Sequence, residues 1–153
     1  MTIDATNPYF RTKVLTASPA ELRLLLLDGA VRFCRRGRDG LAEKDHEKSF
    51  EGLSQAKAII MELINALDHA VDPELCGRLS SLYTFMYTRL LEANLEKSPE
   101  MVDEVIRLLE YERETWSLVV DKLAQEKGAG AAAPGRDAAT DDAPTGATLS
   151  VEG

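Results

Sequence analysis

The residues with the widest chemical repertoire in this sequence are two histidines, His46 and His69, and two cysteines, Cys34 and Cys76. Glu43 lies three residues before His46, and Glu-x-x-His is a pattern that carboxylate-bridged metal sites use twice, on facing helices. The sequence has no second such pair, and both histidines fall near expected helix ends, which favours surface or capping roles. Neither cysteine has a neighbouring histidine to activate it, so we expect two reduced, buried thiols. A small metal protein or enzyme that uses Glu43 and His46 remains the less favoured alternative.

Other function classes are disfavoured by composition and charge. The sequence has no Gly-rich phosphate loop, and its formal net charge of −8 disfavours nucleic acid and anionic membranes as partners. The one basic cluster, Arg35-Arg36-Gly37-Arg38, is expected to be a solvated helix end. No apolar run approaches the length of a membrane span, and the N-terminus lacks the pattern of a signal peptide. We therefore expect a cytosolic binding protein without catalytic residues, metal or cofactor.

Four helix-start signals indicate the elements that position these residues. Ser18-Pro19-Ala20-Glu21 fits a capping box with proline at the first helical position. Asp72-Pro73-Glu74 and Ser98-Pro99-Glu100 repeat the cap, proline and first-turn carboxylate, and Asp45 is a plausible fourth cap. Short connections favour antiparallel neighbours, so the sequence predicts an all-α, antiparallel up-down four-helix bundle. The predicted helices span residues 19–42, 46–69, 73–96 and 99–126.

The first of these helices is unusually apolar. Projected at 100° per residue, its apolar side chains cover ~two thirds or more of the circumference, whereas a core-facing helix needs an arc of roughly 100°. Only Arg23 interrupts this band. The excess surface could lie at the centre of the domain, in a dimer interface or against a partner. Residues expected in the core are Leu22, Leu26, Ala30 and Phe33, and those balanced between core and partner binding are Leu24, Leu27 and Val31.

The two ends of the chain differ from the bundle, which we expect to span residues 18–127. Residues 1–17 carry apolar side chains without a helical period, and this segment could lie as a lid or cap across an apolar groove. Residues 128–153 are rich in Ala, Gly, Asp, Pro and Thr and contain no aromatic residue, which predicts a disordered tail. The candidate lid residues are Tyr9, Phe10, Val14 and Leu15.

Three motifs in order resemble one family. "YFRTKVLTASPAELRLLLLDGAVRF" (residues 9–33) is similar to the N-terminal signature of the flagellin export chaperones, the FliS family. "LYTFMYTRLLEAN" (residues 82–94) resembles the third helix of that family, and "LLEYERETW" (residues 108–116) resembles its last helix. The chain departs from the family pattern at Leu25-Leu26-Leu27, where Met-Leu-Tyr is usual, so no polar role is carried over to Leu27.

The resemblance implies a cytoplasmic chaperone that binds the disordered C-terminal segment of flagellin one-to-one. Such a chaperone prevents premature polymerisation and delivers flagellin to the flagellar type III export machinery, and its N-terminal segment can occupy part of the binding surface. The alternative is a homo-oligomeric structural bundle, or a weak homodimer, that buries the apolar band against its own copy.

Tyr83 and Tyr87 lie off the main stripe of their helix, and Trp116 either fills the core or anchors a partner. The candidate flagellin contacts are Leu24, Leu27, Val31, Tyr83, Tyr87 and Trp116.

Overall fold

The helices begin where the capping residues of the sequence place them. The computed structural model describes residues 8, 9, 12 and 16–132. The Ser18 hydroxyl accepts a hydrogen bond from the N–H of Glu21, whose carboxylate accepts from the N–H of Ser18. The Asp45 and Asp72 carboxylates each accept from the N–H three residues on, and so does the Ser98 hydroxyl. The resulting helices are α2 (Pro19–Glu43), α3 (His46–Asn65), α4 (Pro73–Glu96) and α5 (Pro99–Ala132).

The helix ends agree less closely with the sequence than the starts. α3 ends at Asn65 rather than residue 69, and α5 continues to Ala132 rather than residue 126. The first residues of the predicted tail are therefore helical, and the tail from residue 133 on lies outside the described residues. α2 and α4 each end on a lysine in the left-handed conformation, Lys44 with φ 59° and Lys97 with φ 54°.

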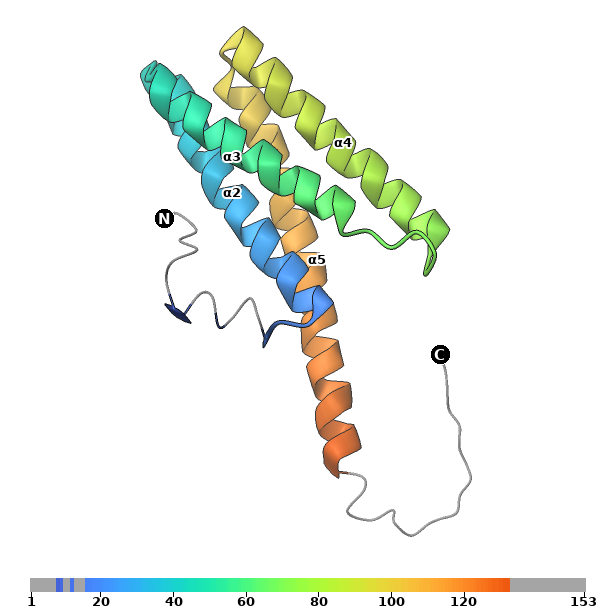
Figure 1. Cartoon of the computed structure of the whole chain (residues 1–153). Helices are drawn as coiled ribbons and strands as arrows, with labels where there is room; N and C mark the ends of the chain where they lie inside the picture. Colours follow the sequence, from blue (N-terminus) through green and yellow to red (C-terminus); the bar gives the residue numbers. More distant parts are fainter. Residues whose placement is uncertain (1–7, 10–11, 13–15, 133–153) are drawn as a thin grey trace. The chain divides into compact units, whose positions relative to one another are not determined.

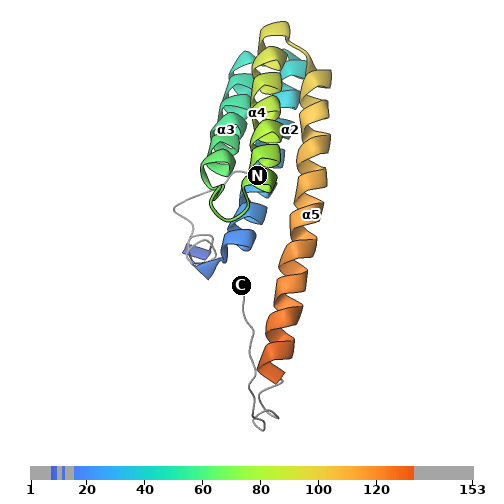
Figure 2. The ribbon, with the colours of Figure 1, turned by 90° about the vertical axis from the view of Figure 1, so that its right-hand side faces the viewer.

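Consecutive helices run in opposite directions. The chain divides into two units, Met1–Ser117 and Leu118–Gly153. Within the first unit, α2, α3, α4 and the first part of α5 lie alongside one another (Figure 1 and Figure 2). The described part of the second unit is the last stretch of α5. Within the first unit, the prediction of an antiparallel up-down four-helix bundle is confirmed.

Three glycines set the close approach of α2 and α3. A Cβ atom added at Gly40 would lie 2.4 Å from the backbone nitrogen of Ser49, and one added at Gly52 would lie 2.4 Å from the backbone nitrogen of Gly37. No described glycine has a positive φ, so space rather than backbone conformation requires glycine at these positions. The backbones of α2 and α3 therefore lie in direct contact at these glycines.

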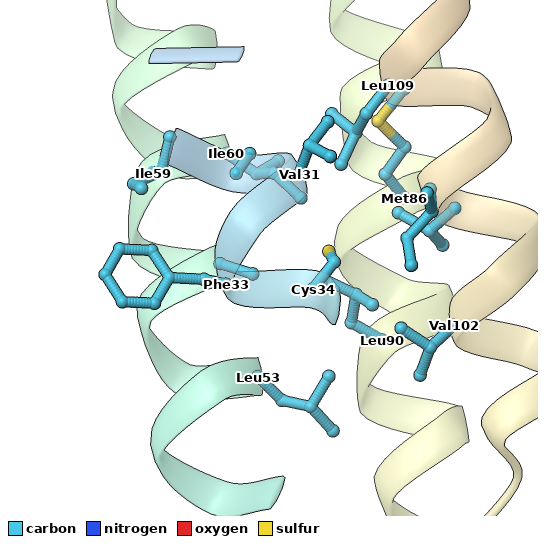
Figure 3. Close-up of a cluster of buried hydrophobic side chains, with 14 of the residues drawn as sticks. Val31, Phe33, Cys34, Leu53, Ile59, Ile60, Met86, Leu90, Val102 and Leu109 are labelled. Carbon is cyan, nitrogen blue, oxygen red and sulfur yellow. The ribbon is translucent and has the colours of Figure 1, made fainter. Parts of the chain in front are cut away.

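The wide apolar band of α2 is covered from two sides. Figure 3 shows Phe33 on the α3 side of α2, and Val31 and Cys34 on the side of α4 and α5. Leu22, expected in the core, is 36% exposed, so that prediction is wrong, and Leu26 is only partly buried. The largest fully buried side chains come from all four helices: Leu27, Cys34, Leu53, Ile60, Leu63, Tyr83, Met86, Leu90, Val102, Val105 and Leu109.

Ion pairs join α2 to its neighbours across the surface. The Arg38 Nε donates to Asp103 of α5 at 2.7 Å, and Arg36 pairs with Glu51 of α3 at 3.1 Å. Arg35 with Glu110, and Asp28 with Arg113, complete a row between α2 and α5. The three arginines of the basic cluster stay solvent-exposed, as expected from sequence, and each also holds a carboxylate on a neighbouring helix.

Candidate partner-binding surface

Three of the six candidate flagellin contacts lie in the core. Leu27, Val31 and Tyr83 are buried, so none is available to a partner in this conformation. The helical wheel identifies the apolar side of a helix but not the directions from which its neighbours approach, and the band of α2 is buried on the side of Leu27 and Val31. The other three candidates, Leu24, Tyr87 and Trp116, are partly exposed.

Tyr83 belongs to a polar cluster among α2, α4 and α5, which we call the Arg23 cluster (Arg23, Tyr83, Glu112 and Trp116). The Tyr83 hydroxyl donates to Glu112 Oε1 at 2.9 Å and accepts from Arg23 Nη1 at 3.3 Å. The indole Nε1 of Trp116 donates to the same Glu112 oxygen at 3.2 Å. The Arg23 guanidinium lies 5.2 Å from the centre of the Trp116 ring and 6.0 Å from that of Tyr83. The cluster therefore holds one cation and one carboxylate, linked by a tyrosine hydroxyl.

Both charged members of the Arg23 cluster are buried, Arg23 being 9% exposed and Glu112 7%. Burial first, and then the nearby Glu112 carboxylate, raise the pKa of Tyr83 well above its usual value, so the phenol remains protonated at neutral pH and can donate to Glu112. From sequence, Arg23 was expected only to interrupt the apolar band. Its place near the middle of that band was the signal, because a cation there must be buried with partners from other helices.

A second feature is a row of exposed apolar side chains along α3 and α4. Lys57 of α3 lies 5.9 Å from the ring centre of Tyr87 of α4, so these faces of the two helices adjoin. Phe50, Lys57 and Met61 share one face of α3, and Tyr87, Leu91 and Leu95 follow at successive turns of α4. Phe50 is 65% exposed and Leu95 81%. We call this surface the α3–α4 strip, and its members are Phe50, Lys57, Met61, Tyr87, Leu91 and Leu95.

Most of the α3–α4 strip was not predicted from the sequence. Only Tyr87 was among the candidate contacts, although the spacing of Tyr87, Leu91 and Leu95, four residues apart, places them along one side of a helix. Among the residues that the structure describes, Lys57 has no carboxylate partner, so the strip combines apolar side chains with one available cation.

The candidate chemical residues have ordinary structural roles. Glu43 pairs with Lys48 at 3.1 Å, and His46 is exposed at the start of α3. Within the described ranges there is no group of three or more His, Cys, Asp or Glu side chains that could hold a metal ion. Cys34 and Cys76 are free and buried, as predicted, and burial raises the pKa of the Cys34 thiol to about 12. The thiol of Cys76 donates to the carbonyl of Asp68 at 3.3 Å.

The lid prediction concerns residues that the structure describes only in part. Tyr9 is 75% exposed, and Phe10, Val14 and Leu15 lie outside the described residues. Over the described part of the chain, no helix combines the length and apolar character needed to cross a membrane.

The first unit defines a class of protein, an antiparallel four-helix bundle that exposes a row of apolar side chains between two of its helices. A family model described as "Flagellar protein FliS" matches residues 2–123, and the chain belongs to the FliS family.

Curated relatives agree with this membership. The chain is 37% identical over 112 residues to the flagellar secretion chaperone FliS of Salmonella typhimurium, covering 72% of this chain and 83% of the relative. It is 34% identical over 112 residues to the protein of that name from Campylobacter jejuni, covering 73% and 88%. It is 31% identical over 124 residues to that of Bacillus subtilis, covering 79% and 92%.

Proposed function

We propose that this protein is a cytoplasmic export chaperone for flagellin. It binds the disordered C-terminal segment of one flagellin subunit, prevents premature polymerisation and delivers the subunit to the flagellar export machinery. The observation that carries this proposal is the exposed α3–α4 strip, in a chain of a family whose curated members are named flagellar secretion chaperones. An apolar row along two helices suits an amphipathic segment that orders as it binds.

The strip also favours a particular client chemistry. Its apolar members would receive the apolar face of the client, and Lys57 would pair with a client carboxylate. Of the six contacts expected from sequence, Leu24, Tyr87 and Trp116 remain candidates because they are partly exposed. Phe50, Met61, Leu91 and Leu95 join them.

Calorimetric titration with flagellin from the same organism tests the proposal. We expect submicromolar one-to-one binding that is lost when the last ~40 residues of flagellin are removed, a length that could span the bundle if extended. Leu95→Glu in the chaperone should weaken binding by about tenfold or more. Tyr111→Glu is the matched control, because Tyr111 is also highly exposed but lies outside the strip. Folded protein that binds neither form of flagellin would refute the proposal.

We further propose that residues 1–17 form a lid that competes with the client. Deleting residues 2–15 should then strengthen flagellin binding or leave it unchanged, because the lid must yield to the client. Loss of binding with the bundle still folded would show instead that the segment contributes contacts or structure.

The second candidate function is a homo-oligomeric bundle that buries the strip against a second copy. Light scattering at micromolar concentration separates the two. A tight dimer that flagellin does not dissociate would favour the oligomer, and a monomer or a dimer that flagellin opens would favour the chaperone.

A further inference from the structure

The guanidinium of Arg23 has more hydrogen-bond donors than its surroundings use. It carries five N–H groups in a planar fork, and the part of the chain described by the structure gives it one acceptor, the Tyr83 hydroxyl at 3.3 Å. Its other close contacts are the ring faces of Trp116 and Tyr83. At 9% exposed, this is a buried cation with incomplete hydrogen bonding, which is costly for folding.

Arg89 shows what complete pairing looks like in the same bundle. Its guanidinium also lies over an aromatic ring, 5.5 Å from the centre of Phe85. Unlike Arg23, it donates to two carboxylates, Glu104 and Glu92, each at 3.0 Å. The two arginines therefore differ in pairing rather than in stacking, and Arg23 is the one with spare donors.

Arg23 itself is buried, but side chains next to it are partly exposed, so a client could reach its donors where this end of the bundle opens locally. Trp116, which lies against the guanidinium, is partly exposed, and so is Leu26, one turn further along α2. Leu22, on the other side, is 36% exposed. An incoming segment could therefore cover apolar side chains and reach the guanidinium together.

We propose that the Arg23 cluster is an anchoring site, in which the spare N–H groups of Arg23 bind an oxygen acceptor of the client segment. This proposal rests on the proposed function, since the client is the flagellin C-terminal segment. A backbone carbonyl is the favoured acceptor: the cluster already holds one cation and one carboxylate, so an uncharged acceptor leaves its charge balanced. Extended segments and helix C-termini present carbonyls that lack partners of their own. The terminal carboxylate of the client is the other possible source.

If Arg23 serves the client, its removal should weaken flagellin binding but change the stability of the free bundle little. Arg23→Met keeps the apolar stem and removes the donors, but it leaves Glu112 buried without the cation. Arg23→Met/Glu112→Gln removes both charges and guards against misfolding of the single variant. Arg89→Met is the matched control, since it removes a stacked arginine whose donors are used within the protein.

The experiment is calorimetric titration of the full-length proteins with intact flagellin, together with urea unfolding of each variant. We expect both Arg23 variants to bind flagellin at least about tenfold more weakly than the wild type, because each loses a hydrogen bond from a charged donor. We expect the double variant to be at least as stable as the wild type, and Arg89→Met to bind within twofold of it. Synthetic C-terminal flagellin peptides with a free or an amidated carboxylate separate the two acceptors. If the Arg23 variants lose the same affinity for both peptides, the acceptor is a backbone carbonyl.

Unchanged affinity in both Arg23 variants, with wild-type protein binding flagellin normally, would overturn the anchoring site and leave the proposed function intact. Unchanged affinity with a large loss of stability in the double variant would assign the cluster to folding alone. Failure of the wild-type protein to bind would overturn both proposals.

Discussion

At the scale of single residues, the glycines between α2 and α3 have a measurable role. We expect Gly40→Ala to destabilise the protein by about 1–3 kcal/mol, the usual cost of overpacking, because the new methyl group would meet the backbone of Ser49 at 2.4 Å. Gly77→Ala in α4 is the control, since a Cβ there meets nothing within 4 Å. It should stabilise the protein by about 0.5–1 kcal/mol. Urea unfolding of the two variants measures both effects, and equal effects would contradict this account.

Cys34 gives the free energy of unfolding a specific dependence on pH. Burial raises the pKa of its thiol from 9.0 to about 12. Between these values the unfolded chain loses the proton and the folded chain keeps it, so stability falls as pH rises. The loss from this thiol should be about 1.4 kcal/mol between pH 8 and pH 10.

Comparison with Cys34→Ala isolates the contribution of this thiol. The variant should be less stable at every pH because of its cavity, but its stability should fall less steeply above pH 8. Parallel pH profiles for the two proteins would show that the thiol does not contribute.

Local chemistry determined which residue positions could be anticipated from sequence. The caps at Ser18, Asp45 and Asp72 were correctly predicted, because a cap depends on atoms within a few residues along the chain. The Arg23 cluster was not, because Tyr83 and Glu112 come from other helices and no spacing within one helix reveals which side chains meet across the bundle. The same limit explains why Leu27 and Val31 were balanced between core and surface.

At the scale of elements, α2 and α5 are joined by charges as well as by the core. Arg35→Glu should destabilise the bundle by about 0.5 kcal/mol, since the pair with Glu110 is exposed and screened by solvent. Arg35→Glu/Glu110→Arg should recover most of the loss, because the pair is restored with its charges exchanged. Thermal unfolding at low and high salt tests this, with the difference shrinking as ionic strength rises. A double variant no more stable than the single one would count against the pair.

Helix ends were harder to anticipate than helix starts. α3 stops at Asn65 although apolar spacing continues to Leu67, because the chain must turn before the cap at Asp72 can begin α4. The close packing of α2 against α3 was also not predicted from the sequence. The glycines that permit this close packing lie among charged residues, and a glycine there does not add to the apolar periodicity from which helix faces are predicted.

At the scale of the whole molecule, we propose that residues after Ala132 contribute no stability to the bundle. The segment 128–153 carries one Arg and four acidic residues, so it holds −3 of the net −8 and leaves −5 on residues 1–127. Truncation after Ala132 should shift the melting temperature by less than about 1 °C, below what a 1 kcal/mol change produces in a domain of this size. A larger decrease would show that the tail packs on the bundle. Scanning calorimetry of both forms decides this.

The placement of the connections gives the two ends of the bundle different local stabilities. The turns at Lys44 and Lys97 lie at the same end, each closing two antiparallel helices with a very short link, whereas residues 66–72 connect α3 to α4 at the opposite end. Amide hydrogen exchange should therefore be slow beside the two lysines and fast near residues 66–72, where local unfolding needs few broken contacts. Arg23 lies toward that second end, near the start of α2. The bundle can thus open locally where we place the client anchor while its far end stays folded, and bound flagellin would appear as slower exchange in that region.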